Sequence, residues 1–531
     1  MMKTSRSHIS NPGLRLPLQR LRPLPLAVAA MLVITGCTLG PDYKRPDIDV
    51  PVAWRAAPAA SAASASGAAA LAAPAGVSAS AVGYVPVELP PVGAAELADT
   101  AWWSAFGDPV LDQLIQTALE NNKDLRIAAF RIQQYDAFLQ VTRAAGLPQV
   151  GAGASRTRDT LSENRQVPLA VGTEPVGNSY EVLGRVAWEL DFWGKFRRAN
   201  ESALAQLMAS EETRRGLVLT LVSDVASAYV QLRSLDSELE VLQRSVASGR
   251  ETLRLLESKY AGGGISEVPV IQARAALEEL TANLPVKEQG IAKLENGLSA
   301  LLGRNPGPIE RGKPITALAL PPIPGGLPAE LLVRRPDIRK AEQDLIAANA
   351  KIGVAKAQYL PDISLTASSG FASTDLSNLT LLTSNFGSFG VTLLGPIFTS
   401  GRIAGQVREA ESAQQQTATA YLLAVQAGLR EVEDALVSHR KTFQRLGIRT
   451  RQLDALRAAR ESAKKRYAGG YTGYLEVLAA DRDVDTGELQ YSQTRSDQYS
   501  ALIAVYKAMG GGWKVADALA PSTSQTTKTA P

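Results

Sequence analysis

Hydrophobic side chains occupy every second position between residues 180 and 192 except 184, which is glycine, and charged side chains occupy several of the positions between them. This alternation predicts a β-strand with one apolar and one charged face. Its length suits a strand of a transmembrane barrel, which needs about 9 to 11 residues, and it suits equally well an edge strand leading into a soluble coiled coil. The apolar set is Tyr180, Val182, Val186, Trp188, Leu190 and Phe192, and the charged set is Glu181, Arg185, Glu189 and Asp191.

The hydrophobic period changes from two to about 3.6 after Trp193-Gly194. Residues 195–268 contain no proline and are rich in Ala, Leu, Glu, Arg and Gln, which predicts a very long helix over 195–261. At ~1.5 Å per residue, such a helix is about 100 Å long. The glycines at 262–264 then predict a sharp reversal into a second helix over 266–302, in which we expect Pro285 to cause a kink.

Regular structure is expected to begin near Ala101. Asp108 precedes Pro109 and the start of helical spacing, so we expect Asp108 to be the N-cap of the first helix. The neighbouring Trp102 and Trp103 are interpreted as core anchors rather than as a ligand cage.

The chain contains an internal duplication. Lys259-Tyr260-Ala261-Gly262-Gly263 recurs as Arg466-Tyr467-Ala468-Gly469-Gly470, displaced by 207 positions, and other landmarks recur in the same order. The predicted first repeat covers 101–310, with strands at about 149–158 and 179–193 and helices at about 195–261 and 266–302. A connector is predicted at 311–329. The predicted second repeat covers 330–513, with strands at about 362–371 and 385–399 and helices at about 402–468 and 473–509.

The N-terminus has the features of a secretory signal. A basic segment and the apolar stretch Leu24 to Ile34 precede Cys37, which predicts a signal peptide over 1–36. The residues Ile34-Thr35-Gly36-Cys37 resemble the bacterial lipobox, in which the cysteine carries acyl chains such as palmitate and anchors the protein. We expect residues 37–100 to be a lipidated extended arm followed by an Ala/Ser-rich tether, and residues 514–531 to be a disordered tail.

Composition excludes several classes of function. The chain has 56 Lys and Arg against 52 Asp and Glu, but five of the basic residues and no acidic residue precede Cys37, so the remainder is nearly neutral and gives no reason to expect nucleic acid as a partner. With one cysteine and two histidines, His8 and His439, the sequence offers no disulfide, metal site or catalytic triad. We therefore predict no enzymatic activity and no cofactor.

The number of strands constrains the assembly. Four strands cannot close a barrel, and an open sheet edge in lipid leaves backbone groups unpaired. Two chains would give eight strands around a filled interior, whereas three would give twelve strands around a lumen. The charged face of the 179–193 strand favours the second arrangement, a homotrimer.

With these landmarks, the chain resembles the outer-membrane efflux proteins, the exit ducts of tripartite drug pumps and secretion systems, in their lipoprotein branch. The resemblance implies a trimeric twelve-stranded transmembrane barrel continued by a long periplasmic helical barrel. It also implies a periplasmic adaptor (membrane fusion) protein and an inner-membrane pump of the RND type as partners. The landmarks are Cys37, Gly40-Pro41-Asp42-Tyr43, Trp54, Trp102-Trp103, Asp108-Pro109, Trp188-Glu189-Leu190-Asp191, Trp193-Gly194-Lys195, Arg335-Pro336-Asp337-Ile338 and Gly510-Gly511-Gly512-Trp513.

The resemblance also assigns roles to residues at the reversals of the long helices. Family members carry adaptor-facing residues there, and they narrow the closed tip with an apolar side chain and a ring of acids. The usual acidic position is Ala479 in this chain, so Glu476 or Asp481 is the candidate substitute beside Leu475. The matching adaptor-facing positions are Lys259, Tyr260, Gly263, Val270 and Ile271 in the first repeat and Arg466, Tyr467, Gly470, Val477 and Leu478 in the second.

The function predicted from these features is a passive outer-membrane duct that carries drugs or other small molecules and is opened at its tip by the adaptor. The alternative hypothesis is a lipid-anchored periplasmic coiled-coil scaffold or adaptor without a barrel. The exported substrate is not readable from the sequence, because a passive duct takes its specificity from the pump.

Overall fold

The computed structural model describes residues 38–48, 50–51, 54, 101–162, 174–321, 323, 328 and 331–511. The predicted signal peptide, Cys37, almost all of the Ala/Ser-rich tether and the predicted tail lie outside the described residues. The chain divides into two compact units. The strand unit comprises residues 1–41, 142–200 and 351–407, and the helical unit comprises residues 42–141, 201–350 and 408–531.

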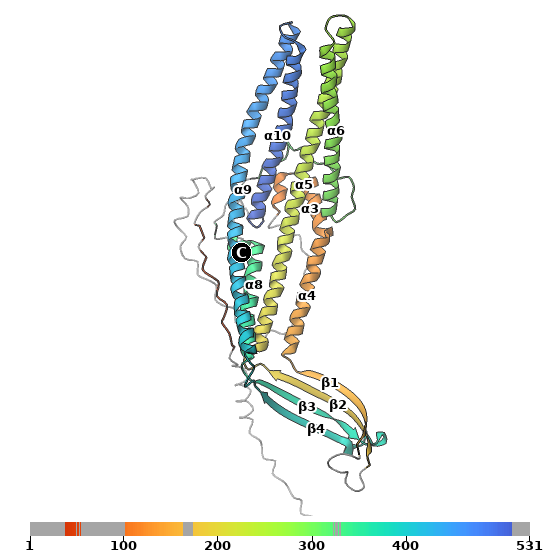
Figure 1. Cartoon of the computed structure of the whole chain (residues 1–531), viewed down its shortest axis with the longest axis vertical. Helices are drawn as coiled ribbons and strands as arrows, with labels where there is room; N and C mark the ends of the chain where they lie inside the picture. Colours follow the sequence, from red (N-terminus) through yellow and green to blue (C-terminus); the bar gives the residue numbers. More distant parts are fainter. Residues whose placement is uncertain are drawn as a thin grey trace, which may run out of the picture. The chain divides into compact units, whose positions relative to one another are not determined.

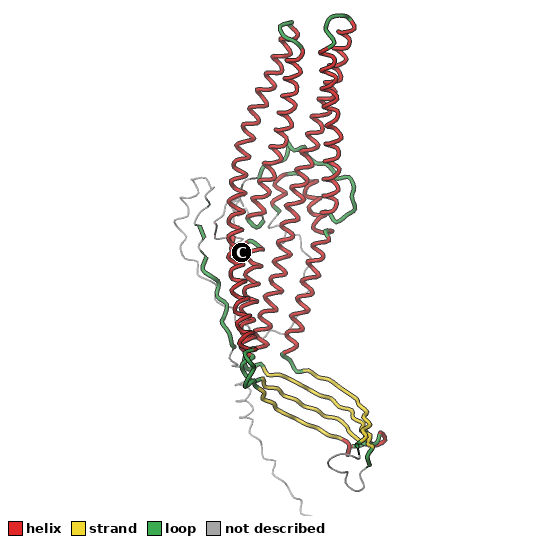
Figure 2. Tube along the Cα trace, in the orientation of Figure 1, coloured by secondary structure: helices red, strands yellow, loops and turns green. Residues whose placement is uncertain are grey.

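The strand unit contains one antiparallel sheet with the order β1-β2-β3-β4 (Figures 1 and 2). Each strand pairs with the next along the chain, so β1 and β4 are the two edges and have no second partner among the described residues. The strands are β1 (Gln149–Thr160), β2 (Val176–Leu190), β3 (Asp362–Ser373) and β4 (Asn385–Leu394).

The register sorts the side chains of the sheet into a mainly apolar face, which also carries Arg156 and Arg158, and a mainly polar face, which also carries Leu183, Phe386 and Leu394. Val186 of β2 lies opposite Val150 of β1 and Ala367 of β3, and successive residues point to opposite faces. The polar face carries Asp159, Glu181, Arg185, Glu189 and Asp362, and the apolar face carries Val150, Val182, Val186, Trp188, Leu190, Ile363, Leu365, Phe371, Phe389, Val391 and Leu393.

The ends of β2 and β4 fall three and five residues before the predicted ends at 193 and 399, while β2 begins three residues earlier than predicted and β1 and β3 each end two residues later. Strand β2 ends at Leu190 because the Asp191 carboxylate accepts hydrogen bonds from the N–H groups of Phe196 (3.1 Å) and Arg197 (2.9 Å), which caps the following helix instead of extending the strand. Strand β4 ends at Leu394 because Gly395 and Pro396 follow it, and proline has no N–H to donate to a ladder.

The helical unit is built on two antiparallel hairpins, α5–α6 and α9–α10, which lie side by side (Figure 1). Helices α5 and α9 have 67 residues each, and α6 continues through Pro285. No helix among the described residues is long and apolar enough to cross a membrane. The bounds are η2 (Trp102–Phe106), α3 (Pro109–Asn121), α4 (Lys123–Ala145), α5 (Lys195–Ala261), α6 (Val268–Leu301), α7 (Leu331–Arg334), α8 (Pro336–Ala357), α9 (Arg402–Ala468) and α10 (Tyr474–Ala508).

The largest core cluster joins the two repeats. The paired tryptophans are buried in it, as predicted, and the Trp102 ring stacks on the Tyr506 ring of α10 with centroids 4.8 Å apart. Phe106 is fully buried and its ring centroid lies 5.9 Å from that of Tyr499. Burial of a large side chain of this kind stabilises a fold by about 1.5–3 kcal/mol, so η2 is a substantial link between the first repeat and α10.

Both repeats contain a hydrogen bond from a side chain to the backbone carbonyl at the end of their last helix, but the donor side chains differ. In the first repeat, Nδ2 of Asn122 donates to the carbonyl of Leu301 at the end of α6 (2.9 Å). In the second, Nη1 of Arg335 donates to the carbonyl of Ala508 at the end of α10 (2.6 Å). Arg335 also forms an ion pair with Glu431 at 2.7 Å, which a neutral amide could not do. The two repeats therefore close in the same way with different chemistry.

A pair of glycine substitutions tests how closely the ends of the long helices pack. Gly303 and Gly263 have similar left-handed φ values of 71° and 72°, but a Cβ on Gly303 would lie 2.1 Å from the carbonyl oxygen of Asn121, whereas one on Gly263 would meet nothing within 4 Å. We expect Gly303→Ala to lower the free energy of unfolding by about 3 kcal/mol or more and Gly263→Ala by about 1–2 kcal/mol. Thermal unfolding of the detergent-extracted chain at one scan rate measures the difference, and equal shifts would contradict this account.

Candidate functional site at the hairpin tips

Both hairpin reversals use the same backbone turn. At the end of α5, the N–H of Gly263 donates to the carbonyl of Tyr260 (2.9 Å) and the N–H of Gly264 donates to the carbonyl of Lys259 (2.8 Å). Gly263 has the left-handed φ that this motif requires. The turn therefore fixes Lys259 and Tyr260 in the last helical turn before the reversal.

The second hairpin repeats this turn at the end of α9. The N–H of Gly470 donates to the carbonyl of Tyr467 (3.0 Å), and the N–H of Tyr471 donates to the carbonyl of Arg466 (2.9 Å). Gly470 has a φ of 74°, close to that of Gly263. The basic residue and tyrosine of each repeat thus occupy equivalent positions in equivalent turns.

The structure brings residues of the two tips together. The Nζ of Lys259 donates to the Oη of Tyr467 (3.2 Å) and lies 5.0 Å from the centroid of that ring. The Tyr467 ring in turn meets the Tyr474 ring edge-on at 5.5 Å. Because the Lys259 contact is exposed, it contributes on the order of 1 kcal/mol or less. A weak link of this kind can hold two tips together and still be broken by a partner.

A small apolar cluster lies beneath the tip of the first hairpin. Leu256 of α5 packs with Val270 and Ala273 of α6, and all three are buried. Tyr474 of α10 packs against this cluster, near Thr252 of α5. Burial raises the pKa of Tyr474, so its hydroxyl stays neutral at physiological pH. The second hairpin is thereby attached to the first by packing as well as by Lys259.

The candidate constriction acids are both paired within the second hairpin. Glu476 forms an ion pair with Arg466 (3.1 Å) and accepts a hydrogen bond from the hydroxyl of Thr472. Asp481 forms an ion pair with Lys464 (3.4 Å). Leu475 is 59% exposed beside them. Each of these two acids therefore has a basic side chain from α9 as its counterion.

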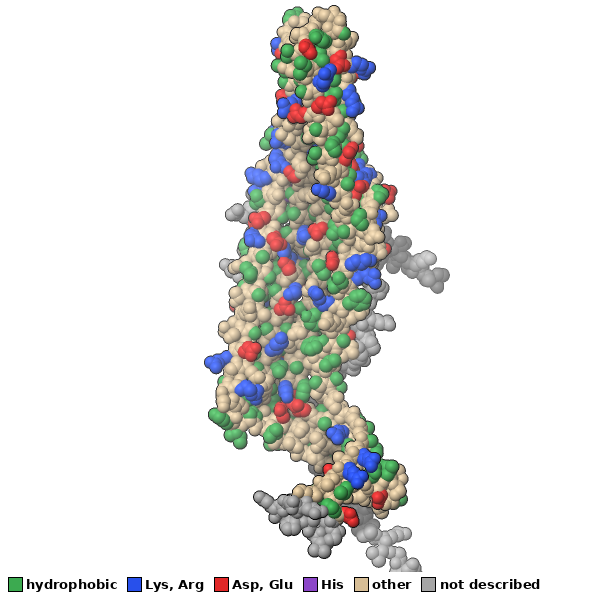
Figure 3. Space-filling model, turned by 45° about the vertical axis from the view of Figure 1, so that its right-hand side comes forward, with side chains coloured by type: hydrophobic (Ala, Val, Ile, Leu, Met, Phe, Trp, Pro, Cys, Tyr) green, Lys and Arg blue, Asp and Glu red, His purple; other side chains and the backbone are tan. Residues whose placement is uncertain are grey.

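The remaining predicted site residues divide into packing and surface positions. Val477 is buried like Val270, and Leu478 is half-buried. Tyr260 and Ile271 are exposed and accessible to another molecule. Over the helices on the face in Figure 3, basic and acidic side chains are interspersed, so no patch of one sign marks this face of the described residues.

Asp485 lies on α10 a little farther from the tips, near Ser245 of α5. The Ser245 hydroxyl donates to the carbonyl of Val241 on its own helix (3.1 Å). Burial raises the pKa of Asp485, the neighbouring carboxylates of Asp481 and Glu488 raise it further, and the nearby Ser245 hydroxyl and Arg460 only partly offset this. The charged form of Asp485 is therefore disfavoured in the folded chain.

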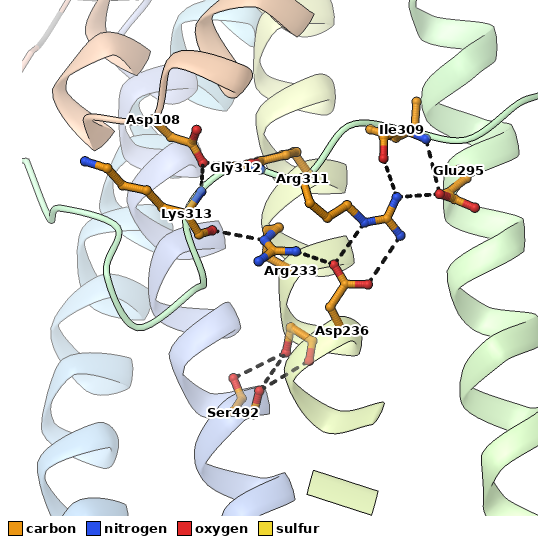
Figure 4. A network of polar contacts seen from close by, with 11 residues as sticks. Asp108, Arg233, Asp236, Glu295, Ile309, Arg311, Gly312, Lys313 and Ser492 are labelled. Atoms are coloured by element: carbon orange, nitrogen blue, oxygen red, sulfur yellow. Dashed lines mark hydrogen bonds and ion pairs between the residues drawn. The ribbon is translucent and has the colours of Figure 1, made fainter. Parts of the chain in front are cut away.

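Sequence reasoning missed a polar network that joins α3, α5, α6 and the connector (Figure 4). Asp108 is the predicted N-cap, and its Oδ1 accepts from the N–H of Val110 (3.0 Å). Its Oδ2 also accepts from the hydroxyl of Tyr229 (2.7 Å) and the N–H of Lys313 (3.0 Å). Burial is the main reason that the pKa of Tyr229 is raised, and the Asp108 hydrogen bond adds to it. A capping residue thus also fastens the connector to α5.

The network continues through alternating charges. Arg233 pairs with Asp236 (2.5 Å), and Asp236 also binds Arg311 of the connector (3.1 Å). Arg311 in turn binds Glu295 of α6, whose pKa is lowered because the hydrogen bonds from Arg311 and from the N–H of Ile309 outweigh the effect of burial. No periodic pattern marks these residues, because they converge from distant parts of the chain.

Other features of the helical unit offer little chemistry. A cavity of about 270 Å³ lies among α5, α9, α10 and the connector. Its charged lining residues Arg244 and Arg457 both pair with Glu488 (3.4 and 2.7 Å), and Arg495 binds connector carbonyls. Among the residues that the structure describes, no group of three or more His, Cys, Asp or Glu side chains could hold a metal ion.

Comparison with known proteins identifies the family. The model of the outer membrane efflux protein family matches residues 114–304 and 327–511. The chain belongs to the outer membrane efflux protein family. This confirms the predicted family and outer-membrane location and favours a channel over the scaffold alternative.

Individual relatives match almost the whole chain. The chain is 33% identical to the solvent efflux pump outer membrane protein SrpC of Pseudomonas putida, over 92% of this chain and 98% of that protein. It has the same identity and coverage with the toluene efflux pump outer membrane protein TtgI, also of Pseudomonas putida. The open-state MtrE outer membrane channel of Neisseria gonorrhoeae has a TM-score of 0.75 and 28% identity, with 90% of this chain and 98% of that chain covered. The predicted fold class, with four strands per chain and long helices in two repeats, is confirmed by these comparisons and the model.

Replacing Asp485 should change stability with a definite pH dependence. Because its folded pKa is raised, the protonated form favours folding below the ordinary aspartate pKa of about 3.8, and that contribution is lost as pH rises through the folded pKa. We expect Asp485→Asn to raise the unfolding temperature at pH 7 by about 1–2 °C and to have no effect at a pH below the ordinary pKa. Thermal scans across this range test it, with Asp483→Asn, an exposed acid of the same helix, as the matched control. A destabilised Asp485→Asn variant at pH 7 would refute the assignment.

Proposed function

We propose that the chain assembles as a homotrimer whose strands form one twelve-stranded barrel in the outer membrane. The observation that carries this proposal is the open sheet, which has an apolar face, a polar face and two edges, β1 and β4, that are unpaired among the described residues. An exposed edge in lipid costs several kcal/mol for each unpaired backbone group. Pairing of β4 with β1 of the next protomer removes every edge, and the number of strands then leaves a water-filled lumen.

The two faces of the sheet suit the two environments of such a barrel. The apolar face supplies a surface for lipid, and the polar face lines the lumen with Glu181, Arg185 and Glu189. Helices α5 and α9, each about 100 Å long, continue the wall of the duct across the periplasm. Transport through the duct is passive, and the inner-membrane pump supplies the energy.

The N-terminal arm supports anchoring by a lipid on Cys37. The residues after this cysteine are held in place, because Arg198 donates through Nε to the carbonyl of Leu39 (3.2 Å) and the N–H of Leu39 donates to the carbonyl of Trp193 (3.2 Å). Acyl chains on the preceding cysteine would give the chain a membrane anchor additional to the barrel.

The partners are a periplasmic adaptor and an inner-membrane pump, and the hairpin tips are the contact surface for the adaptor. In this proposal Tyr260, Ile271 and the basic residues Lys259 and Arg466 meet the adaptor directly. The glycines shape the turns, and the buried Val270 and Val477 support them by packing. Leu478 completes the surface beside Val477, and Tyr467 holds Lys259 until the adaptor displaces it.

Closure of the duct is assigned to the second hairpin. Leu475 narrows the lumen, and Glu476 and Asp481 provide the acidic ring in place of Ala479. The ion pairs with Arg466 and Lys464 hold these acids in one orientation. The adaptor opens the tip by untwisting the hairpins, which breaks these exposed and individually weak contacts.

The cargo class follows from the names of the relatives, which are solvent and toluene efflux proteins. We assign small organic molecules, drugs among them, to this chain. The identity of the cargo is set by the pump, because the lumen of a wide passive duct does not select strongly.

Images of the detergent-extracted particle test the assembly. Electron microscopy is expected to show a hollow tube with three-fold symmetry. A monomeric particle, or a particle without a continuous lumen, would rule out the shared barrel.

Conductance measurements test the proposed closure. We expect the Arg466→Ala and Tyr467→Phe double variant to raise the open fraction in planar bilayers, because each lost exposed contact of about 1 kcal/mol shifts a two-state equilibrium about fivefold. Arg449→Ala is the matched control, since Arg449 bonds Gln452 on the same helix at 2.6 Å and contacts none of the tip residues named above. Unchanged conductance in the double variant, with the trimer intact, would remove this pair from the mechanism.

A further inference from the structure

Two arginines break the separation of charge between the faces of the sheet. The other charged residues of the four strands, Asp159, Glu181, Arg185, Glu189 and Asp362, lie on the polar face. Arg156 lies opposite Tyr180 in the register and Arg158 lies opposite Asn178, which places both side chains on the apolar face. Burial or a structural ion pair does not explain them, because both are exposed and neither forms an ion pair among the described residues.

Their position along the strands is as unusual as their face. The apolar face of β2 runs from Val182 to Leu190, nine residues, which matches the ~9–11 residues that a tilted strand needs to cross a membrane. Tyr180 and its partner Arg156 lie one step beyond this stretch, at the end of β1 farther along the chain from α4. In the barrel proposed above, this end of the apolar face meets the headgroups of the outer leaflet.

The local chemistry favours a phosphate ligand. The guanidinium carbon of Arg156 lies 5.5 Å from the centroid of the Tyr180 ring, which orients it while its N–H groups stay available. Arg158 is two positions farther on and points to the same face. In the trimer the neighbouring β4 would lie beside β1, and β4 (Asn385–Leu394) contains no charged residue that could pair with either arginine. Paired guanidinium groups without a carboxylate are well suited to bind phosphate bidentately.

We propose that Arg156 and Arg158, oriented by Tyr180, form a binding site for the phosphate groups of a phosphorylated outer-leaflet glycolipid, three sites to a trimer. The proposal rests on the proposed barrel and its orientation. The apolar face beside the arginines takes the acyl chains, so the site recognises a phosphate that is attached to a lipid. The site would fix the height of the barrel in the outer leaflet.

The test uses the full-length trimer in detergent and native mass spectrometry with diphosphorylated lipid A as the probe. We expect the Arg156→Ala and Arg158→Ala double variant to bind this lipid about 30-fold more weakly. Lysine at both positions should retain part of the affinity, because the charge remains while bidentate binding is lost. Arg185→Ala is the matched control, since Arg185 lies on the same sheet and points to the polar face. Phosphatidylcholine, which has no net charge, should bind the wild type and the double variant equally.

Several outcomes would overturn the proposal. Equal lipid A binding by wild type and double variant would do so, as would an equal loss in Arg185→Ala. Displacement of the lipid by inorganic phosphate at matched phosphate concentration would show that the site binds free phosphate and does not require a lipid. Images of the same samples separate the two hypotheses, because a three-fold tube with unchanged lipid binding rejects this site alone, whereas loss of the tube in wild type rejects the barrel.

Discussion

Backbone pairing at the edges of the sheet is the constraint on which the strand unit depends. Among the described residues, strands β1 and β4 have partners on one side only, and a membrane offers no water to satisfy the other side. The faces of the sheet match lipid and lumen, so its edges can be paired only by strands with the same faces. Another copy of the chain provides such strands. The strand unit is thus incomplete as a monomer, and its stability in the membrane depends on association.

Polar contacts within one chain hold the segments of the helical unit together. Asp108 accepts three hydrogen bonds, two of them from other segments, and Arg335 ties the start of α8 to α9 and to the end of α10. These contacts lie between regions distant in sequence, so they fix the hairpins before any partner arrives. The tips differ, because Lys259, Arg466 and Glu476 make exposed contacts that contribute little individually. The contacts of Asp108 and Arg335 therefore hold the helices firmly in place, whereas the hairpin tips can rearrange.

Patterns of neighbouring residues predicted the features that depend on the conformations of those residues alone. Alternation predicted the faces of β2, and the glycines at 262–264 predicted the reversal, because both follow from the conformations of neighbouring residues. The predicted ends of β2 and β4 were wrong because a single residue determines where each strand stops. Asp191 caps the next helix, and Pro396 has no N–H for the ladder. The network of Arg233, Asp236 and Arg311 was not predictable, since no spacing reveals that the connector returns to α5. The same reason hid the contact of Lys259 with Tyr467, whose positions differ by 208 residues.

The closing contact of each repeat shows how a duplicated chain diverges. Asn122 in one half and Arg335 in the other donate to the carbonyl at the same point of equivalent helices. The acceptor belongs to the main chain, so no substitution can remove it. The donor differs between the halves, being a neutral amide in one and a charged guanidinium in the other. A contact inherited from the duplicated ancestor can thus be retained through its backbone acceptor while the side-chain donor changes. Sequence identity between the two halves consequently understates their common ancestry.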